Sequence, residues 1–454
     1  MKTIHCIGIG GIGVSALARF FLSRGAFVSG SDERDGSWRK PLEDEGARVF
    51  IGHNANNIPE GCDLIIYSSA VPKNNPERKE ASRRGITQKT YAEGLGEAMK
   101  EYPVRIAVSG THGKTTTTAL LGLMFEEAKK DPMVIVGGKV SLWGSNFRNG
   151  RGSIAIAEAC EYERAFDALS PTITIVGNIE ADHLDYYRDV DEITDAFRNF
   201  VARLPKNGIL SYNADDELVK NITARAGCKK ISFGIKNDAD IMTKNRTITN
   251  GSQSFDVFKN DILLGSVTLY IPGVFNISNA LAALSISLEC GVSFNEAKKV
   301  LESFVGSWRR FEKVGSINGK PVISDYAHHP TAVRGTIRAA KEFFPDKKIL
   351  AVFQPHQRDR TLKLFDEFSK AFESADGVIL SEIYDVVGRN KAKKEISSKD
   401  LASAIQKRNL KQYVSYARDL DETKKMIKNI IKNFDVLLIM GAGDVDTIAH
   451  SVLL

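Results

Sequence analysis

The stretch V-R-I-A-V-S-G-T-H-G-K-T-T at residues 104–116 decides the fold of the central part of the chain. Its first six residues are typical of a buried strand, and the loop G-x-x-G-K-T follows at once, shorter than the usual G-x-x-x-x-G-K. Glycine N–H groups can surround phosphate oxygens, Lys114 can reach the β- and γ-phosphates, and the Thr115 hydroxyl can bind Mg²⁺. Threonines can also simply cap a helix, but a strand before the loop and a helix after it favour nucleotide binding.

The chain is too long for a single hydrophobic core, because 454 residues exceed the size at which proteins divide into domains. Strand and helix patterns alternate and restart twice, which predicts an α/β fold with parallel sheets. We expect a Rossmann-like domain at residues 1–102 and a central P-loop ATPase-like domain at 103–312, with an added β subregion near 229–271. A second Rossmann-like domain should occupy 313–454, with one amphipathic helix over 361–375.

Two further predicted strands end in side chains that can bind a metal. Glu158 ends one strand, and His183 lies just beyond the other. Ligands of open α/β sheets bind at the carboxyl ends of the strands, so both residues should face the phosphate loop. A carboxylate and an imidazole can complete a Mg²⁺ shell with the Thr115 hydroxyl. Either residue alone would more often be a surface or capping residue, but its place behind a phosphate loop favours a metal site.

The first loop, G-I-G-G-I-G at residues 8–13, fits G-x-G-x-x-G between a strand and a helix, and Asp32 follows the second strand. This dinucleotide fingerprint makes a nicotinamide-dependent oxidoreductase a rival hypothesis. The same glycines would accept any pyrophosphate at a helix N-terminus. A tight turn that only packs a helix on a sheet is the structural alternative.

Composition excludes several classes of protein. The formal net charge is only +6 and the basic residues form no stripe, so no nucleic-acid partner is expected. No apolar run approaches the ~20 residues that span a bilayer, and no signal peptide precedes the first strand, so we expect a cytoplasmic protein without membrane insertion. The five cysteines form no C-x-x-C pair, which indicates reduced thiols.

The motifs together resemble the Mur ligase family over nearly the whole chain. Its phosphate loop is similar to G-T-H-G-K-T-T, and its magnesium-histidine segment to N-I-E-A-D-H-L-D at residues 178–185. The remaining matches are an adenine segment at 272–283, an arginine segment W-R-R-F-E at 308–312, and three C-terminal segments: D-Y-A-H-H-P at 325–330, F-Q-P-H at 353–356 and G-A-G-D at 441–444.

Two N-terminal runs, G-I-G-G-I-G-V-S at residues 8–15 and S-S-A-V-P with N-P-E at 68–77, resemble the branch that adds L-alanine to UDP-N-acetylmuramate. The resemblance implies an ATP-dependent ligase of peptidoglycan precursor synthesis that uses Mg²⁺ or Mn²⁺ and acts through an acyl phosphate. We expect a monomer or weak dimer. A recycling ligase that adds a murein peptide to the same sugar nucleotide remains an alternative. A nucleotide-binding module without catalysis is a third hypothesis.

The resemblance also implies a role for each site residue. ATP would be bound by Gly110, Thr111, His112, Gly113, Lys114, Thr115, Thr116, Asn276, Asn279, Arg310 and Asp325. The sugar nucleotide would be bound by Gly8, Gly10, Gly11, Gly13, Ser15, Asp32, His53, Ser68 and Ser69. The amino acid would be bound by Tyr326, His328 and Arg360, and the metal by Thr115, Glu158 and His183. Catalysis would rest on Lys114, His183, Arg310 and His328.

Three positions depart from the family pattern. Cys160 stands where a carboxylate is usual, Phe275 replaces a histidine of the adenine segment, and Gln357 displaces an arginine to Arg358. We expect the joint between the second and third domains near residues 305–315, where glycines can absorb backbone rotation. The third domain should close on the second after ATP and the sugar nucleotide bind, so the amino acid enters last.

Overall fold

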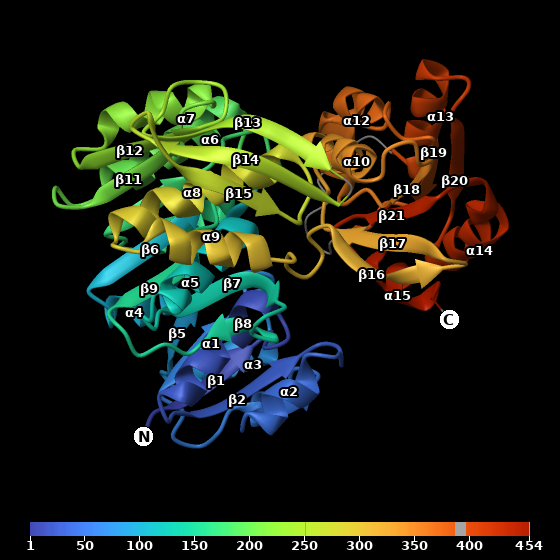
Figure 1. The fold of residues 1–454 in the computed structure, drawn as a ribbon. Helices are drawn as coiled ribbons and strands as arrows, with labels where there is room; N and C mark the ends of the chain where they lie inside the picture. Colours follow the sequence, from blue (N-terminus) through green and yellow to red (C-terminus); the bar gives the residue numbers. More distant parts are fainter. Residues whose placement is uncertain (250, 386–395, 454) are drawn as a thin grey trace.

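The computed structural model describes residues 1–249, 251–385 and 396–453. The chain folds into three α/β domains, and Figure 1 shows the N-terminal domain below the central domain and the C-terminal domain beside it. The α/β fold with three domains predicted from the strand and helix patterns is therefore confirmed, as are the parallel sheets at its centre.

The N-terminal domain is a five-stranded, fully parallel sheet in the order β3-β2-β1-β4-β5, which is a Rossmann-like arrangement. The strands are β1 (Thr3–Ile7), β2 (Phe27–Asp32), β3 (Arg48–Ile51), β4 (Leu64–Tyr67) and β5 (Thr87–Thr90). The helices are α1 (Ile12–Ser23), α2 (Arg39–Asp44), α3 (Pro76–Arg83) and α4 (Tyr91–Lys100), with a 3₁₀ turn at Ala55–Asn57.

The central domain contains a ten-stranded sheet in the order β15-β14-β13-β12-β11-β10-β6-β9-β7-β8. The neighbouring strands from β13 through to β7 pair in parallel. At one edge, β14 and β15 continue from β13 as antiparallel strands and form the added β subregion. At the other edge, β8 pairs antiparallel with β7. The strands are β6 (Val104–Ser109), β7 (Met133–Val140), β8 (Ser145–Arg148), β9 (Ile154–Glu158), β10 (Ile173–Val176), β11 (Ile209–Asn213), β12 (Lys229–Gly234), β13 (Ile241–Thr249), β14 (Ser252–Lys259) and β15 (Ile262–Leu269). The helices are α5 (Lys114–Glu127), α6 (Val190–Ala202), α7 (Glu217–Ile222), α8 (Val274–Glu289) and α9 (Phe294–Ser303), with 3₁₀ turns at Tyr162–Ala168 and Thr223–Arg225.

The C-terminal domain has a six-stranded sheet in the order β16-β17-β21-β18-β19-β20, parallel except for the β16–β17 hairpin. The strands are β16 (Glu312–Ile317), β17 (Lys320–Asp325), β18 (Ile349–Phe353), β19 (Gly377–Ser381), β20 (Tyr413–Ala417) and β21 (Val436–Met440). The helices are α10 (Pro330–Phe343), α11 (Arg358–Lys363), α12 (Phe365–Ala371), α13 (Ser398–Arg408), α14 (Leu420–Ile430) and α15 (Asp446–Ser451), with a 3₁₀ turn at Ile431–Asn433. The single helix expected over 361–375 is wrong: Leu364, with φ −111° and ψ 26°, breaks it into α11 and α12, and α12 ends at Ala371.

The N-terminal and central domains share one hydrophobic core. Apolar residues of the first sheet and of α1 pack in the same buried cluster as residues of β7, β9 and α6. Asn146 on β8 reinforces this contact, because its side chain donates to the Ile12 carbonyl and accepts from Arg19 at 3.1 Å. The N-terminal domain is therefore fixed against the sheet that carries the phosphate loop.

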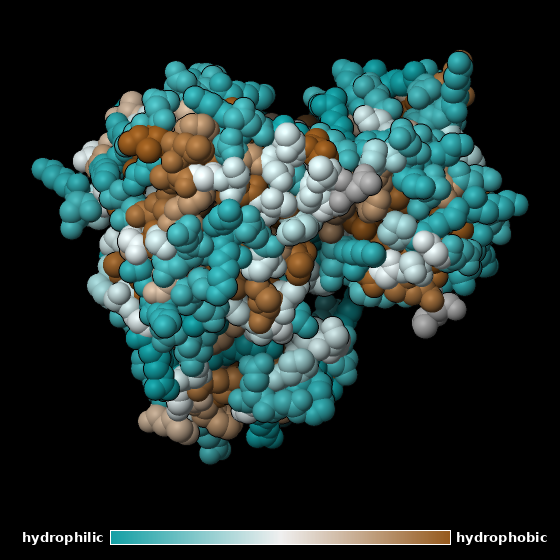
Figure 2. All heavy atoms as spheres, viewed as in Figure 1, coloured by the Kyte–Doolittle hydropathy of each residue, from teal (hydrophilic) through white to brown (hydrophobic). Residues whose placement is uncertain are grey.

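The surface is mainly polar in the view of Figure 2, and apolar residues gather chiefly over the central domain. The exposed large apolar side chains of that domain include Ile262, Leu263 and Tyr270. Among the described residues, no helix combines the length and the apolar character that crossing a membrane requires.

Candidate active site

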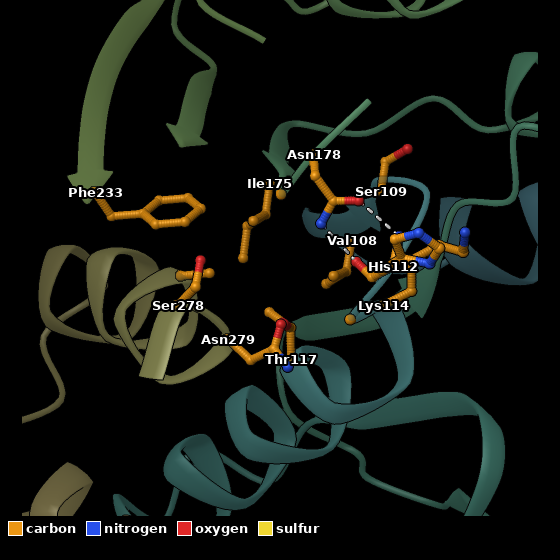
Figure 3. A pocket seen from close by; sticks show the side chains of 13 residues that line it. Val108, Ser109, His112, Lys114, Thr117, Ile175, Asn178, Phe233, Ser278 and Asn279 are labelled. Atoms are coloured by element: carbon orange, nitrogen blue, oxygen red, sulfur yellow. Dashed lines mark hydrogen bonds between the residues drawn. The ribbon is translucent and has the colours of Figure 1, made fainter. Parts of the chain in front are cut away.

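The phosphate loop joins the carboxyl end of β6 to the start of α5, as the sequence predicts. Gly110 and Gly113 have φ angles of 135° and 83°, which glycine adopts without strain. Asn178, beyond β10, holds the loop: its side chain accepts the His112 N–H at 2.7 Å and donates to the His112 carbonyl at 3.0 Å (Figure 3). No side chain of the described residues caps α5 at Gly113, so the first N–H groups of this helix are suited to phosphate oxygens.

A pocket lies beside this loop, between α5, α8 and the ends of the central strands (Figure 3). Val108, Ile175 and Phe233 give it apolar walls, and Asn279 gives it an amide edge. Asn279 donates to Asn276 at 3.1 Å, so the two amides predicted to bind adenine do share one face of α8. A Cβ at Gly113 would lie 2.1 Å from the Asn279 side-chain oxygen, which explains why the loop needs glycine there.

The partly buried Lys114 forms an ion pair with the buried Glu161, Nζ to Oε2 at 2.9 Å. The same ammonium donates to the Gly110 carbonyl at 2.5 Å and the Thr111 carbonyl at 3.3 Å, so the lysine folds back over its own loop. Burial disfavours its charge, but Glu161 outweighs burial, and the pKa of Lys114 is raised above its ordinary value. A charged lysine is therefore held where phosphate would bind.

The residues predicted to bind metal lie around this ion pair. Glu158 accepts a hydrogen bond from the Gly137 N–H in β7. The Thr115 methyl group lies close to the next residue, since a Cβ built on Gly138 would be 3.1 Å from it. Glu158 and Thr115 therefore both lie beside the same segment of β7. His183 lies on the other side, with Nε2 3.7 Å from Oε1 of Glu161. Glu161 thus stands between His183 and Lys114.

Residues 309–311, within the predicted joint, contact both the central and the C-terminal domain. Arg310 donates to the Thr115 hydroxyl at 3.2 Å and lies 5.0 Å from the centre of the Tyr326 ring. Asp325, predicted to bind ATP, accepts the N–H groups of Phe311 at 2.7 Å and Ala327 at 2.8 Å. Burial raises the pKa of Asp325. The carboxylate therefore ties the joint to β17.

The two glycines expected to absorb rotation at this joint behave differently. Gly306 has φ 101°, a conformation that favours glycine. Gly315 lies in β16. A Cβ at this position would be 2.7 Å from the Leu453 side chain, so glycine is needed here to let Leu453 pack closely. Arg309 and Phe311 have φ angles of 55° and 50°, which places strained backbone in the joint itself.

Arg360, the predicted carboxylate clamp, binds Asp182 of the central domain through Nε at 3.0 Å and Nη2 at 2.8 Å. Burial alone would raise the pKa of Asp182, but Arg360 and the neighbouring histidines hold it well below its ordinary value. His328 lies 3.9 Å from the same carboxylate, and its ring centre lies 5.2 Å from that of Tyr326. The three residues predicted to hold the amino acid therefore gather at the domain boundary.

The N-terminal glycine loop is closed by Asp32, which accepts the Gly10 N–H at 2.9 Å. Ser68 lies beside Gly8, since a Cβ built on Gly8 would be 3.1 Å from the Ser68 side chain. His53 forms a hydrogen bond with the Ser31 hydroxyl at 2.9 Å. Ser15 instead donates to the Ile12 carbonyl at 3.0 Å. Of the other residues predicted there, Gly11 lies on the same loop, Gly13 in the first turn of α1, and Ser69 two residues beyond β4.

Aromatic side chains cover this loop. A Cβ at Gly10 would lie 2.4 Å from the Trp38 ring, and one at Gly13 would lie 2.7 Å from the Tyr91 ring. Both glycines therefore allow close packing of a ring. Sequence reasoning did not assign Trp38 or Tyr91 to the site.

The three departures from the family pattern fall at distinct places. Arg358 donates to Asp385 at 2.7 Å, away from Asp182, so the displaced arginine has a separate partner. Phe275 is partly exposed at the start of α8. Its ring lies near Gly335 of the C-terminal domain, since a Cβ built on Gly335 would be 3.6 Å from the ring. Cys160 is exposed between Glu158 and the buried Glu161.

Three family models match successive parts of the chain. They are described as the Mur ligase family catalytic domain at residues 3–103, the Mur ligase middle domain at 108–287, and the Mur ligase glutamate ligase domain at 309–443. A UDP-N-acetylmuramate–L-alanine ligase of Clostridium kluyveri is 45% identical over 445 residues, which cover 98% of this chain and 96% of the relative. The chain belongs to the Mur ligase family.

Solved Mur ligases have the same architecture over their full length. The UDP-N-acetylmuramate-alanine ligase of Thermotoga maritima matches with a TM-score of 0.85 and 28% identity, covering 100% of this chain and 98% of that one. A murein peptide ligase of Psychrobacter arcticus matches with a TM-score of 0.75 and 25% identity, over 100% and 98%. The fold therefore lies nearer to the alanine ligase than to the peptide ligase.

Two acidic residues of the candidate site were not predicted from the sequence. Glu161 and Asp182 adjoin residues that were assigned, and both are buried although charged. Their only signal in the sequence is position: Glu161 lies three residues after Glu158, and Asp182 directly precedes His183. Only the fold shows that they bind Lys114 and Arg360.

Proposed function

We propose that this Mur ligase joins the amine of L-alanine to the lactyl carboxylate of UDP-N-acetylmuramate, with ATP as the energy source, in peptidoglycan precursor synthesis. The observation that carries this proposal is the near full-length identity of 45% to an enzyme of that name. The arrangement of charged groups supports it. A continuous series of contacts links Lys114 through Glu161, His183 and Asp182 to Arg360, and so connects the phosphate loop with the predicted amino-acid site.

Each domain supplies one part of the site in this proposal. The domain at residues 1–102 binds the sugar nucleotide, the domain at 103–312 binds ATP, and the domain at 313–454 binds the amino acid. The glycine loop closed by Asp32 takes the UDP pyrophosphate. The pocket between α5 and α8 takes the nucleotide, with its amide edge toward the base.

The reaction then proceeds in two steps. A lactyl carboxylate oxygen attacks the terminal phosphorus of ATP, the bond to ADP breaks, and an acyl phosphate forms. Lys114 and Arg310 stabilise the charge that develops on the transferred group. The alanine nitrogen next attacks the acyl carbon, phosphate leaves with the bonding electrons, and the nitrogen loses a proton.

We assign that proton to His328, because this residue lies at the proposed amino-acid site and presents a ring nitrogen that is free among the described residues. Burial and the nearby Arg360 hold its pKa well below the ordinary value, so the imidazole is neutral at pH 7. Its Nδ1 lies 2.9 Å from the Tyr326 carbonyl and donates to it, which leaves Nε2 as the acceptor. Arg360 orients the alanine carboxylate with paired N–H donors.

Thr115, Glu158 and His183 would hold Mg²⁺, or Mn²⁺, which supplies positive charge to the phosphate oxygens. The fit rests on oxygen donors: Glu158 and Thr115 flank one segment of β7 beside Lys114. The widely spaced, free cysteines suit a cytoplasmic location, and we infer a monomer or weak dimer, which sedimentation velocity would test.

A substrate panel tests the proposed function. Phosphate release should require ATP, UDP-N-acetylmuramate and L-alanine together, with Gly and L-Ser as weaker substrates, since one methylene changes binding by only ~1–3 kcal/mol. Faster turnover with a murein peptide in place of L-alanine would show a recycling ligase instead. A change in nicotinamide absorbance without phosphate release would show an oxidoreductase.

A further inference from the structure

Three side chains outside the predicted magnesium set converge between the central and C-terminal domains. They are His112 of the phosphate loop, Glu180 beyond β10, and His329 just before α10. One potential ligand atom from each lies within 4.8 Å of the other two. Glu180 Oε2 is 3.4 Å from Nε2 of His112 and 3.4 Å from Nδ1 of His329.

These separations are close to those of a zinc site. Tetrahedral bonds of about 2.0–2.1 Å place neighbouring ligand atoms roughly 3.3 Å apart. Both histidine–glutamate distances, at 3.4 Å, already match this value. The third pair, at 4.8 Å or less, needs a shift of at most about 1.5 Å, which side-chain rotation can supply.

The nitrogen atoms also have the right chemistry. His329 Nε2 lies 3.3 Å from the Ala181 carbonyl, and donation to that oxygen leaves the Nδ1 lone pair on the Glu180 side. Metal-bound histidines commonly use their other ring N–H in this way. Nδ1 also accepts the Thr331 N–H at 3.4 Å as the N-cap of α10, a long bond that metal binding would replace. His112 Nε2 is buried and faces the Glu180 carboxylate at 3.4 Å, longer than a usual hydrogen bond, so a cation between the two atoms would satisfy both.

We propose that His112, Glu180 and His329 bind a transition-metal ion of the Zn²⁺ type, which bridges the phosphate loop and the C-terminal domain. Two imidazoles and one carboxylate favour Zn²⁺, Co²⁺ or Ni²⁺ over Mg²⁺, which prefers oxygen ligands. A bound ion holds the two domains in the arrangement described here and slows the opening that turnover requires. His112 also belongs to the predicted ATP-binding loop, so a bound ion restrains that loop as well as the domain opening, and its occupancy inhibits the enzyme.

Titration of the untagged, full-length protein with Co²⁺ alone tests the site, with visible absorption as the signal. His329→Asn keeps a side-chain acceptor at the helix N-terminus but removes the imidazole. This variant should bind Co²⁺ at least about tenfold more weakly than the wild type. The exposed His450→Asn is the matched control and should bind like the wild type. Equal binding by His329→Asn, no binding by the wild type, or loss only in His183→Asn would overturn the site.

Inhibition tests the bridge. At one buffered free Zn²⁺ concentration and excess Mg²⁺, the wild type and His450→Asn should lose a larger fraction of their zinc-free rate than His329→Asn does. Equal fractional losses in all three proteins would contradict the bridging role. The Co²⁺ titration uses no substrate, so its result does not depend on the proposed ligase activity.

Discussion

Arg360 of the C-terminal domain and Asp182 of the central domain form a buried ion pair in which two guanidinium N–H groups, at 3.0 and 2.8 Å, bind one carboxylate oxygen. The predicted amino-acid clamp is thus already bound to a carboxylate of the magnesium-histidine segment. Because the pair crosses the domain boundary, alanine binding and domain closure involve the same side chain. A substrate carboxylate must share or displace Asp182 to reach it.

Arg360→Ala should therefore raise KM for L-alanine by roughly 10- to 150-fold, the equivalent of ~1.5–3 kcal/mol for a charged hydrogen bond. KM for ATP should change far less, because the proposed ATP pocket lies on α5 and α8. Arg358→Ala is the matched control, since Arg358 binds Asp385 and should leave both constants nearly unchanged. Equal increases in the two constants for Arg360→Ala would contradict the clamp.

The same pair makes stability depend on pH. The folded-state pKa of Asp182 lies well below its ordinary value of 3.8, so its contribution is full above that pH and is lost as the pH falls toward the folded pKa. Asp182→Asn leaves Arg360 buried without its charged partner and should cost ~3–5 kcal/mol of unfolding free energy near neutral pH. In urea titrations, the difference between wild type and variant should shrink below about pH 4. A difference that stays constant down to pH 2.5 would exclude this origin.

Substitutions at Lys114 and Glu161 should distinguish the effect of this ion pair on catalysis from its effect on stability. Lys114→Ala should lower kcat by at least about 10²-fold, as for the loss of one group that stabilises transition-state charge. It also leaves Glu161 buried without its lysine, so the protein should be destabilised. Adding Glu161→Gln should restore much of the stability and none of the activity. If the double variant recovers turnover, the phosphate-binding role of Lys114 is wrong.

Glu158 should set the metal requirement. Activity should vanish with a chelator and return with Mg²⁺ or Mn²⁺. Glu158→Gln should raise the Mg²⁺ concentration for half-maximal rate by about tenfold or more, because a charged oxygen ligand is lost. Glu289, partly buried and ion-paired with Lys229, is the control: Glu289→Gln should titrate like the wild type. An unaltered Mg²⁺ titration for Glu158→Gln would remove it from the ligand set.

Much of the site follows from sequence because the loops at strand ends have fixed positions in an α/β sheet. The phosphate loop before α5 and the paired amides of α8 both lie where the sequence predicts them. Residues whose role depends on a contact with a distant part of the sequence did not follow. Asp182 binds Arg360, which is 178 residues away in the sequence. Trp38 covers Gly10. Neither contact produces a pattern among neighbouring residues of the sequence. The break at Leu364 was missed because the apolar pattern continues across it.

ATP-driven ligation through an acyl phosphate can be followed directly by isotope transfer. UDP-N-acetylmuramate labelled with ¹⁸O in its lactyl carboxylate is incubated with the enzyme, ATP, Mg²⁺ and L-alanine, and the products are analysed by mass spectrometry. We predict UDP-N-acetylmuramoyl-L-alanine and inorganic phosphate that carries one ¹⁸O for each turnover. Formation of the ligated product with unlabelled phosphate, or no ligated product at all, would contradict the account.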